Sequence, residues 1–171
     1  TMSLRDSMTD LACEYVTWKG GLAHSGMLDC AQWFMEHIGR QLILFAEEYQ
    51  VPNVIITGHS LCGSTAALTT IMLWELLREQ EVQEGLGWPK LQSGEAIKLH
   101  CYSYGTPAIL SPDLACKYDH LIDNFILSND IVPRLSYGSV LDLQMLIVWA
   151  AENGSASDLF WGKDRSKSSS N

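Results

Sequence analysis

The sequence predicts an α/β fold in which helices cover both faces of a largely parallel sheet. Short β-branched runs, of the kind buried in parallel sheets, alternate with longer segments whose apolar residues recur every three or four positions. With 47% hydrophobic and 18% charged residues, the composition is that of one globular domain. We expect this domain to span residues 1–153, and the serine-rich residues 154–171 to form a flexible tail or the start of an insertion loop.

The first half of the chain is expected to supply two helices and one strand. A capping-box sequence near the N-terminus predicts a short helix over about residues 4–14. Regular apolar spacing predicts a long helix over residues 27–49. The β-branched run at 53–57 is typical of a buried strand, which we expect to end at Gly58.

The second half continues the alternation. We expect a helix over about residues 61–81, a strand over 97–104 and a helix that begins at Ser111, where proline occupies the first helical position. A short strand is expected over 123–128, and a second capping box predicts a helix over 139–153. Strands separated by helices in this way are what a parallel sheet requires.

Charge and composition exclude several classes of function. The formal net charge of −9 opposes the phosphate backbone, so no nucleic-acid partner is expected. The longest apolar run, Met145 to Ala151, is far shorter than the ~20 residues that cross a bilayer, and the N-terminus has no signal-peptide pattern. We therefore expect a cytoplasmic or membrane-associated protein. An odd number of cysteines without a C-x-x-C pair favours small buried thiols over disulfides: Cys13, Cys30, Cys62, Cys101 and Cys116.

The most informative segment is residues 54–68, where a strand meets a helix through the tight turn Gly58-His59-Ser60-Leu61-Cys62. This pattern is typical of a nucleophile elbow, in which Ser60 sits in a strained turn above the sheet and the amide of Leu61 faces a developing oxyanion. Small residues must flank such a serine. Gly58 fits, but Cys62 stands where glycine is usual, so we expect its side chain to crowd the turn. The alternative is that Gly58 only ends the strand and Ser60 caps the helix.

A catalytic serine needs a histidine as base and a carboxylate that orients the histidine. Asp130 is the candidate carboxylate, because it follows the strand expected to end near Ser128, although aspartate is also common in plain turns. The histidine usually comes last in this architecture. All five histidines nevertheless precede Asp130: His24, His37, His59, His100 and His120. His120 stays open as an out-of-order base.

Four stretches resemble the class 3 lipases, and most of all the sn-1-specific diacylglycerol lipases: residues 1–11, 23–31, 58–68, and 102–107 together with 129–136. The resemblance implies an incomplete α/β-hydrolase fold, with the first strands and the C-terminal part missing. It makes Ser60 the nucleophile, Asp130 the triad acid, and Thr1 an oxyanion-hole residue beside the amide of Leu61. By the same resemblance, His24 supports the structure and is not the base.

Members of this family cleave acylglycerol esters through an acyl-serine intermediate at lipid surfaces. The resemblance therefore implies a lipase or esterase whose substrate is an acylglycerol, in particular diacylglycerol, with a membrane surface as partner. Only the resemblance points to Ca²⁺, because no His, Cys, Asp or Glu cluster has the spacing of a metal site, and no other cofactor is expected. Because no histidine follows Asp130, we expect the 171-residue chain alone to be inactive.

Two other functions fit the same residues. A non-catalytic relative that kept the fold as a binding or scaffold module would account for the missing histidine and for Cys62. A soluble peptidase or acyltransferase on the same scaffold would share Ser60, but the stretch 133–136 gives it no support.

Overall fold

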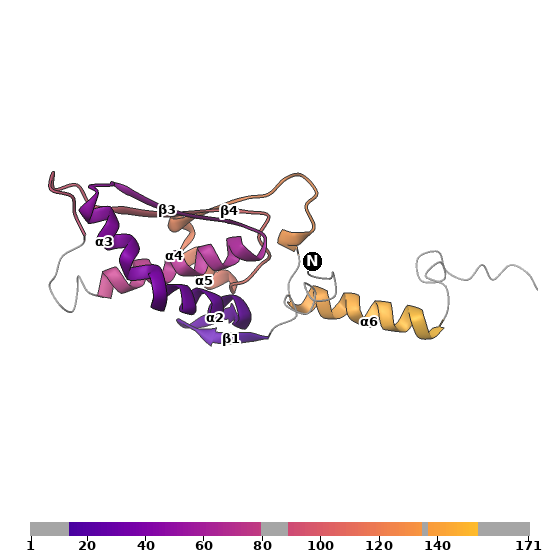
Figure 1. Ribbon diagram of the computed structural model, residues 1–171. Coiled ribbons are helices and arrows are strands. Elements are labelled where there is room, and N and C mark those ends of the chain that lie inside the picture. Colours follow the sequence, from indigo (N-terminus) through magenta and orange to yellow (C-terminus); the bar gives the residue numbers. More distant parts are fainter. Residues whose placement is uncertain (1–13, 80–88, 135–136, 154–171) are drawn as a thin grey trace, which may run out of the picture.

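The computed structural model describes residues 14–79, 89–134 and 137–153. Within them a three-stranded parallel sheet packs against a layer of helices (Figure 1). The helix expected over 4–14, residues 80–81 of the helix expected over 61–81, Thr1 and the segment 154–171 lie outside the described residues. The elements, in chain order, are β1 (Tyr15–Trp18), β2 (Gly21–His24), α2 (Ser25–Phe34), η1 (Met35–Gly39), α3 (Arg40–Glu48), β3 (Asn53–His59), α4 (Leu61–Glu79), β4 (Lys98–Tyr104), α5 (Pro112–Lys117), η3 (Asp119–Leu121), β5 (Ile122–Phe125), η4 (Val132–Arg134) and α6 (Tyr137–Asn153).

The sheet has the order β3-β4-β5, and all neighbouring strands are parallel. The register pairs His59 of β3 with Tyr104 of β4, and Tyr104 with Phe125 of β5. The carboxyl ends of the three strands therefore meet at one edge. Open α/β sheets place their functional sites at this edge.

Helices cover one face of this sheet, so the prediction that they cover both faces is wrong for the described part of the chain. Leu99 and Cys101 of β4 are buried beneath the helices, whereas Ile55, Tyr104 and Phe125 on the other face are exposed. The reason lies in the strand order. A right-handed crossover is strongly preferred, and successive crossovers in one direction place their helices, here α4 and α5, on the same face. Figure 1 shows the helical layer below β3 and β4.

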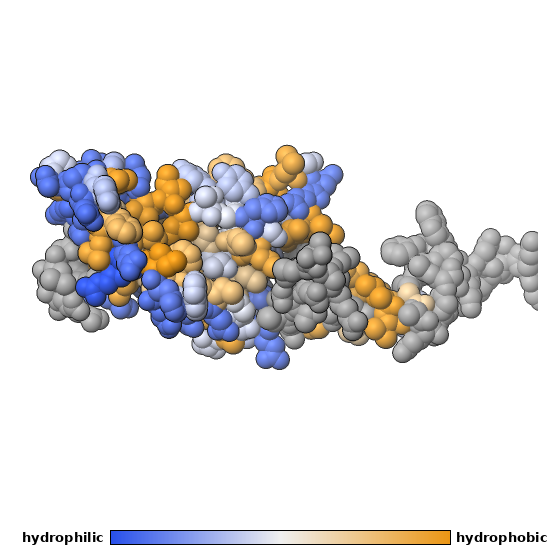
Figure 2. Space-filling model, in the orientation of Figure 1, coloured by the Kyte–Doolittle hydropathy of each residue, from blue (hydrophilic) through white to orange (hydrophobic). Residues whose placement is uncertain are grey.

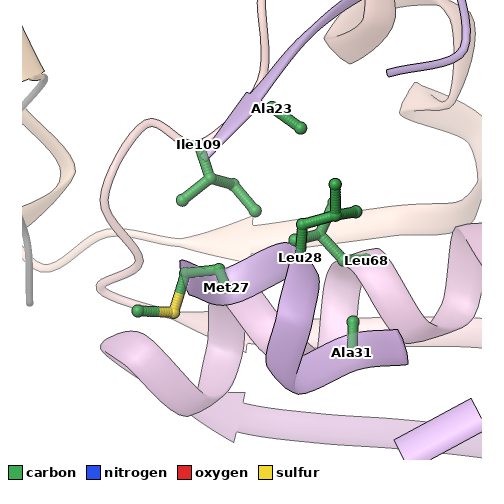
Figure 3. Close-up of a cluster of buried hydrophobic side chains, with 6 residues drawn as sticks. All are labelled: Ala23, Met27, Leu28, Ala31, Leu68 and Ile109. Carbon is green, nitrogen blue, oxygen red and sulfur yellow. The ribbon is translucent and has the colours of Figure 1, made fainter. Parts of the chain in front are cut away.

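Helix α4 is the centre of the core. Its residues Leu68 and Ile71 are fully buried, and small residues on the same helix allow the sheet to approach closely. Figure 3 shows one cluster that α4 forms with α2, with the end of β2 and with the segment after β4. Its buried members are Ala23, Met27, Leu28, Ala31, Leu68 and Ile109. Truncation of a large side chain at such a site typically costs ~2–5 kcal/mol of stability.

Several boundaries differ from the sequence predictions. The helix expected over 27–49 is helical over 25–48, but a π-helical turn, η1, separates its two α-helical parts. Strand β3 runs through Gly58 to His59, and β5 ends at Phe125 instead of Ser128. Helix α6 begins two residues before the capping box expected at Ser139.

An antiparallel hairpin, β1–β2, was not predicted. It turns at Lys19 and Gly20, which both have positive φ (+47° and +86°), as a tight hairpin turn requires. The hairpin ends on His24, the last residue of β2.

Helix α6 extends away from the sheet (Figure 1). Its apolar side chains are largely exposed, with Met145 at 70% and Val148 at 55%, and they form part of the apolar surface seen in Figure 2. None of the helices in the described ranges is both long and apolar enough to cross a membrane.

Candidate active site

The turn between β3 and α4 consists of Ser60 alone. Ser60 has φ +54°, in the left-handed region that residues with a side chain rarely adopt. Its amide donates to the carbonyl of Tyr104 (2.9 Å), and its own carbonyl accepts from Ser64 (3.2 Å). A helix N-cap normally has extended φ, so this geometry differs from that of a simple cap. Such strain costs on the order of 1–3 kcal/mol and is found mainly at functional sites.

Two glycines allow the strand and the helix to meet at this turn. A Cβ on Gly58 would lie 2.4 Å from the carbonyl oxygen of Cys62, and a Cβ on Gly63 would lie 2.8 Å from the carbonyl oxygen of Gly58. The expectation that Cys62 crowds the turn is therefore wrong, because the crowded positions are 58 and 63 while the side chain of Cys62 is exposed. The sequence analysis gave Gly63 no role. The signal that could have found it is a glycine one residue beyond position 62, where the elbow glycine is usual.

The first residue of α4 is Leu61. The first amides of a helix have no acceptor within that helix, so the N–H of Leu61 is available to an oxygen beside Ser60. The other residue expected at an oxyanion hole, Thr1, lies outside the described residues.

Asp130 lies in the loop after β5, five residues beyond Phe125. One carboxylate oxygen, Oδ1, accepts from the amide of Val132 (3.0 Å), which fixes the side chain as an Asx turn does. The other oxygen, Oδ2, lies over Gly105: a Cβ built on Gly105 would be 2.6 Å from it and 3.8 Å from Nε2 of His59. The sequence analysis gave Gly105 no role beyond ending a strand. Here a position without a side chain, with φ +56°, makes room for the carboxylate.

Backbone hydrogen bonds join the Ser60 turn and the Asp130 loop through the end of β4. Tyr104 accepts from the amide of Ser60 (2.9 Å), and the amide of the next residue, Gly105, donates to the carbonyl of Phe125 (2.9 Å). The structure therefore brings Ser60, Gly105 and the loop of Asp130 to the same sheet edge.

His59, which precedes Ser60, lies at this junction. The other four histidines lie away from it. His24 is buried, and its Nδ1 accepts from the amide of Met27 at the start of α2 (3.4 Å). His37 bonds to the carbonyl of Trp33 on its own helical segment. His100 pairs with Asp123 on the open face of the sheet. His120 packs against Trp74 just before β5, at the opposite edge from Asp130.

An apolar cavity of about 650 Å³ lies between α2, β3 and α4, beside the Ser60 turn. Its lining includes Cys30, Trp33, Phe34, Ile56, Cys62 and Ala66. The expectation of buried thiols is wrong for Cys30, Cys62 and Cys116, which are exposed, and right for Cys101; Cys13 lies outside the described residues. Burial raises the pKa of the Cys101 thiol to about 11. Among the described residues no group of three or more His, Cys, Asp or Glu side chains could hold a metal ion.

The family model that matches this chain is Lipase (class 3), over residues 1–139. Similar curated proteins include diacylglycerol lipase-beta of Mus musculus, 29% identical over 165 residues, and diacylglycerol lipase-alpha of Homo sapiens, 26% identical over 152 residues. The matches cover 90% and 79% of this chain, but only 21% and 12% of the two relatives. The chain therefore spans a small part of the relatives' length.

Solved lipase structures share the fold. A triacylglycerol lipase whose catalytic centre is formed by a serine protease triad matches with a TM-score of 0.61 and 24% identity, over 80% of this chain and 49% of its own. A fungal lipase in complex with an inhibitor matches with a TM-score of 0.59 and 26% identity, over 79% and 48%. These findings confirm the incomplete α/β-hydrolase fold and the resemblance that the sequence motifs carry. The chain belongs to the class 3 lipase family.

Proposed function

We propose that this chain carries the nucleophile and the acid of a serine lipase that hydrolyses acylglycerol esters, with diacylglycerol as the substrate. The observation that carries the proposal is the left-handed Ser60, held at the sheet edge to which Asp130 also comes, in a chain of the class 3 lipase family. The diacylglycerol lipases among its relatives favour that substrate.

In the proposed reaction, Oγ of Ser60 attacks the ester carbonyl carbon and its proton passes to a histidine base. The amide of Leu61, with that of Thr1, stabilises the oxyanion, and each such donor typically lowers the barrier by about 3 kcal/mol. The histidine then protonates the leaving alcohol, and water releases the fatty acid from Ser60. Asp130 orients the histidine and stabilises its charged form.

The histidine base of such a mechanism usually follows the acid in the sequence. In this chain all five histidines precede Asp130, so none of them occupies that position. We therefore expect the purified 171-residue chain to show no turnover of a short-chain ester. A longer natural chain that includes a histidine after Asp130 should show turnover.

A lipid surface is the proposed partner of the site. The loop that carries Asp130 exposes three large apolar side chains, with Leu127 at 83% and Ile131 at 65% exposure and Ile126 beside them. Exposed apolar groups gathered beside a site mark contact with an apolar partner. Their position next to the carboxylate suits a substrate that is delivered from a lipid phase.

A fluorophosphonate probe tests the proposal in the longest natural chain that contains these residues. The probe should label Ser60, and Ser60→Ala should abolish the labelling. Ser64→Ala is the matched control, because Ser64 lies one turn further along α4 and is fully buried. If the unsubstituted protein is not labelled, the second candidate holds: a non-catalytic binding or scaffold module.

A further inference from the structure

The short turn at the end of β4, residues 104–106, contacts both halves of the proposed site. Tyr104 accepts the amide hydrogen of Ser60, and Gly105 donates to Phe125 and leaves room for Asp130. The third residue, Thr106, is buried, with 7% of its surface exposed.

Each end of the Thr106 side chain has its own partner. A Cβ built on Gly63 would lie only 2.3 Å from the methyl carbon Cγ2 of Thr106. The methyl group of Thr106 therefore packs directly on the first turn of α4. Its hydroxyl donates to Oδ1 of Asn124 on β5 (2.9 Å), an oxygen that also accepts from Ser103 (3.2 Å). One side chain therefore links the helix that follows Ser60 to the strand that precedes Asp130.

We propose that Thr106 is a positioning residue, which fixes the separation of Ser60 and Asp130 by bridging α4 and β5. The inference rests on the proposed function for its catalytic consequence, but the bridge itself is a property of the fold. Thr106 acts through the turn, since its methyl and hydroxyl groups are engaged with Gly63 and Asn124. The hydroxyl is the group that reaches β5: valine would keep the packing on Gly63 and lose the donor to Asn124, while serine would keep the donor and lose only the methyl group.

Amide hydrogen exchange measured by NMR on the 171-residue chain tests the bridge without any need for activity. Thr106→Val should speed exchange ~10-fold at the amides of Ser60 and Gly105, whose bonds hold the turn. The control is Thr70→Val, which removes another buried hydroxyl from α4. This hydroxyl donates to Ala66 of its own helix and lies against the thiol of Cys101, in the middle of β4 and outside the turn at 104–106. In Thr70→Val, the exchange rates at Ser60 and Gly105, divided by the rates at core amides, should stay as they are in the unsubstituted chain.

Fluorophosphonate labelling of the longest natural chain tests the catalytic consequence. Thr106→Val should lower the maximal labelling rate of Ser60 ~10-fold or more, with little change in the probe concentration that gives half of that rate, and Thr106→Ser should restore most of it. Equal exchange at Ser60 and Gly105 in Thr106→Val and Thr70→Val would overturn the inference, as would an unchanged maximal rate. If exchange changes as expected but the unsubstituted protein is not labelled, the bridge stands and the proposed function fails.

Discussion

Replacement of Gly105 by alanine should displace the Asp130 carboxylate. An added Cβ would lie 2.6 Å from Oδ2, and ordinary van der Waals contact begins at 3.4 Å, so the carboxylate must move by about 0.8 Å. A misplacement of about 1 Å at a catalytic group typically costs ~10²-fold in rate. We therefore expect Gly105→Ala to slow labelling of Ser60 by ~10–100-fold in the longest natural chain.

The same substitution also places a side chain at φ +56°, which costs about 1 kcal/mol whatever surrounds it. Gly94→Ala separates the two effects. Gly94 has φ +85° and nothing within 4 Å of an added Cβ, and it lies before β4, at the opposite edge of the sheet. In chemical denaturation, Gly94→Ala should lose about as much stability as backbone strain costs in Gly105→Ala. Labelling of Ser60 should not change in this control.

A direct readout of the carboxylate is the ¹³C chemical shift of Asp130 in the 171-residue chain. The shift should change in Gly105→Ala and stay constant in Gly94→Ala. If Gly105→Ala is labelled as fast as Gly94→Ala, the carboxylate tolerates the new methyl group, and the reasoning that Gly105 makes room for a catalytic acid is refuted.

Four further outcomes follow from particular side chains. Ser60→Gly should raise the free energy of unfolding by about 1 kcal/mol, because glycine adopts φ +54° without strain; a loss of stability in denaturant titration would contradict the strained turn. Ser64→Ala should leave stability unchanged or raise it, since Oγ of Ser64 is buried without a hydrogen-bond partner; a loss of ~1–3 kcal/mol would instead reveal a bound water. At pH 8 the exposed cysteines should react with a maleimide while Cys101, whose pKa burial raises to about 11, stays unmodified by mass spectrometry. Burial alone would raise the pKa of Glu75, but the hydrogen bond from Tyr118 and two nearby lysines outweigh it and lower this pKa, so its ionised form stabilises the fold above pH ~4.5. That stability should fall as the pH drops through the lowered pKa, and Glu75→Gln should flatten the pH dependence of the free energy of unfolding below about pH 4.5.

The strand-to-helix turn could be predicted from the sequence because its signals are local. A β-branched run, a glycine, a serine and a helix start rich in small residues lie within residues 54–68, and the structure puts a left-handed serine among them. Asp130 was harder to place. Its loop is longer than expected, because β5 ends at Phe125 and the exposed residues after it continue as a loop, not as a strand.

What the sequence could not predict depends on contacts between distant residues. Strand order, and with it the open face of the sheet, is not encoded in any local pattern, so the expectation of helices on both faces failed. The π-helical turn η1 leaves the apolar spacing of the long helix nearly unchanged. The roles of Gly63 and Gly105 become visible only when Thr106 and Asp130 arrive from other parts of the chain.

The cost of the Ser60 turn bears on the choice between a lipase and a scaffold. Positive φ by itself does not mark a functional site in this chain, since Gln50 has the same φ of +54° after α3. What distinguishes Ser60 is that its strained turn lies at the sheet edge to which Asp130 also comes. The glycines at 58, 63 and 105 keep the space around Ser60 and Asp130 clear, because any side chain at these positions would collide with neighbouring atoms. The chain therefore maintains a destabilising geometry together with the residues that make it feasible. Such a combination is expected where strain serves chemistry, since strained positions persist when the surrounding structure holds them and function requires them.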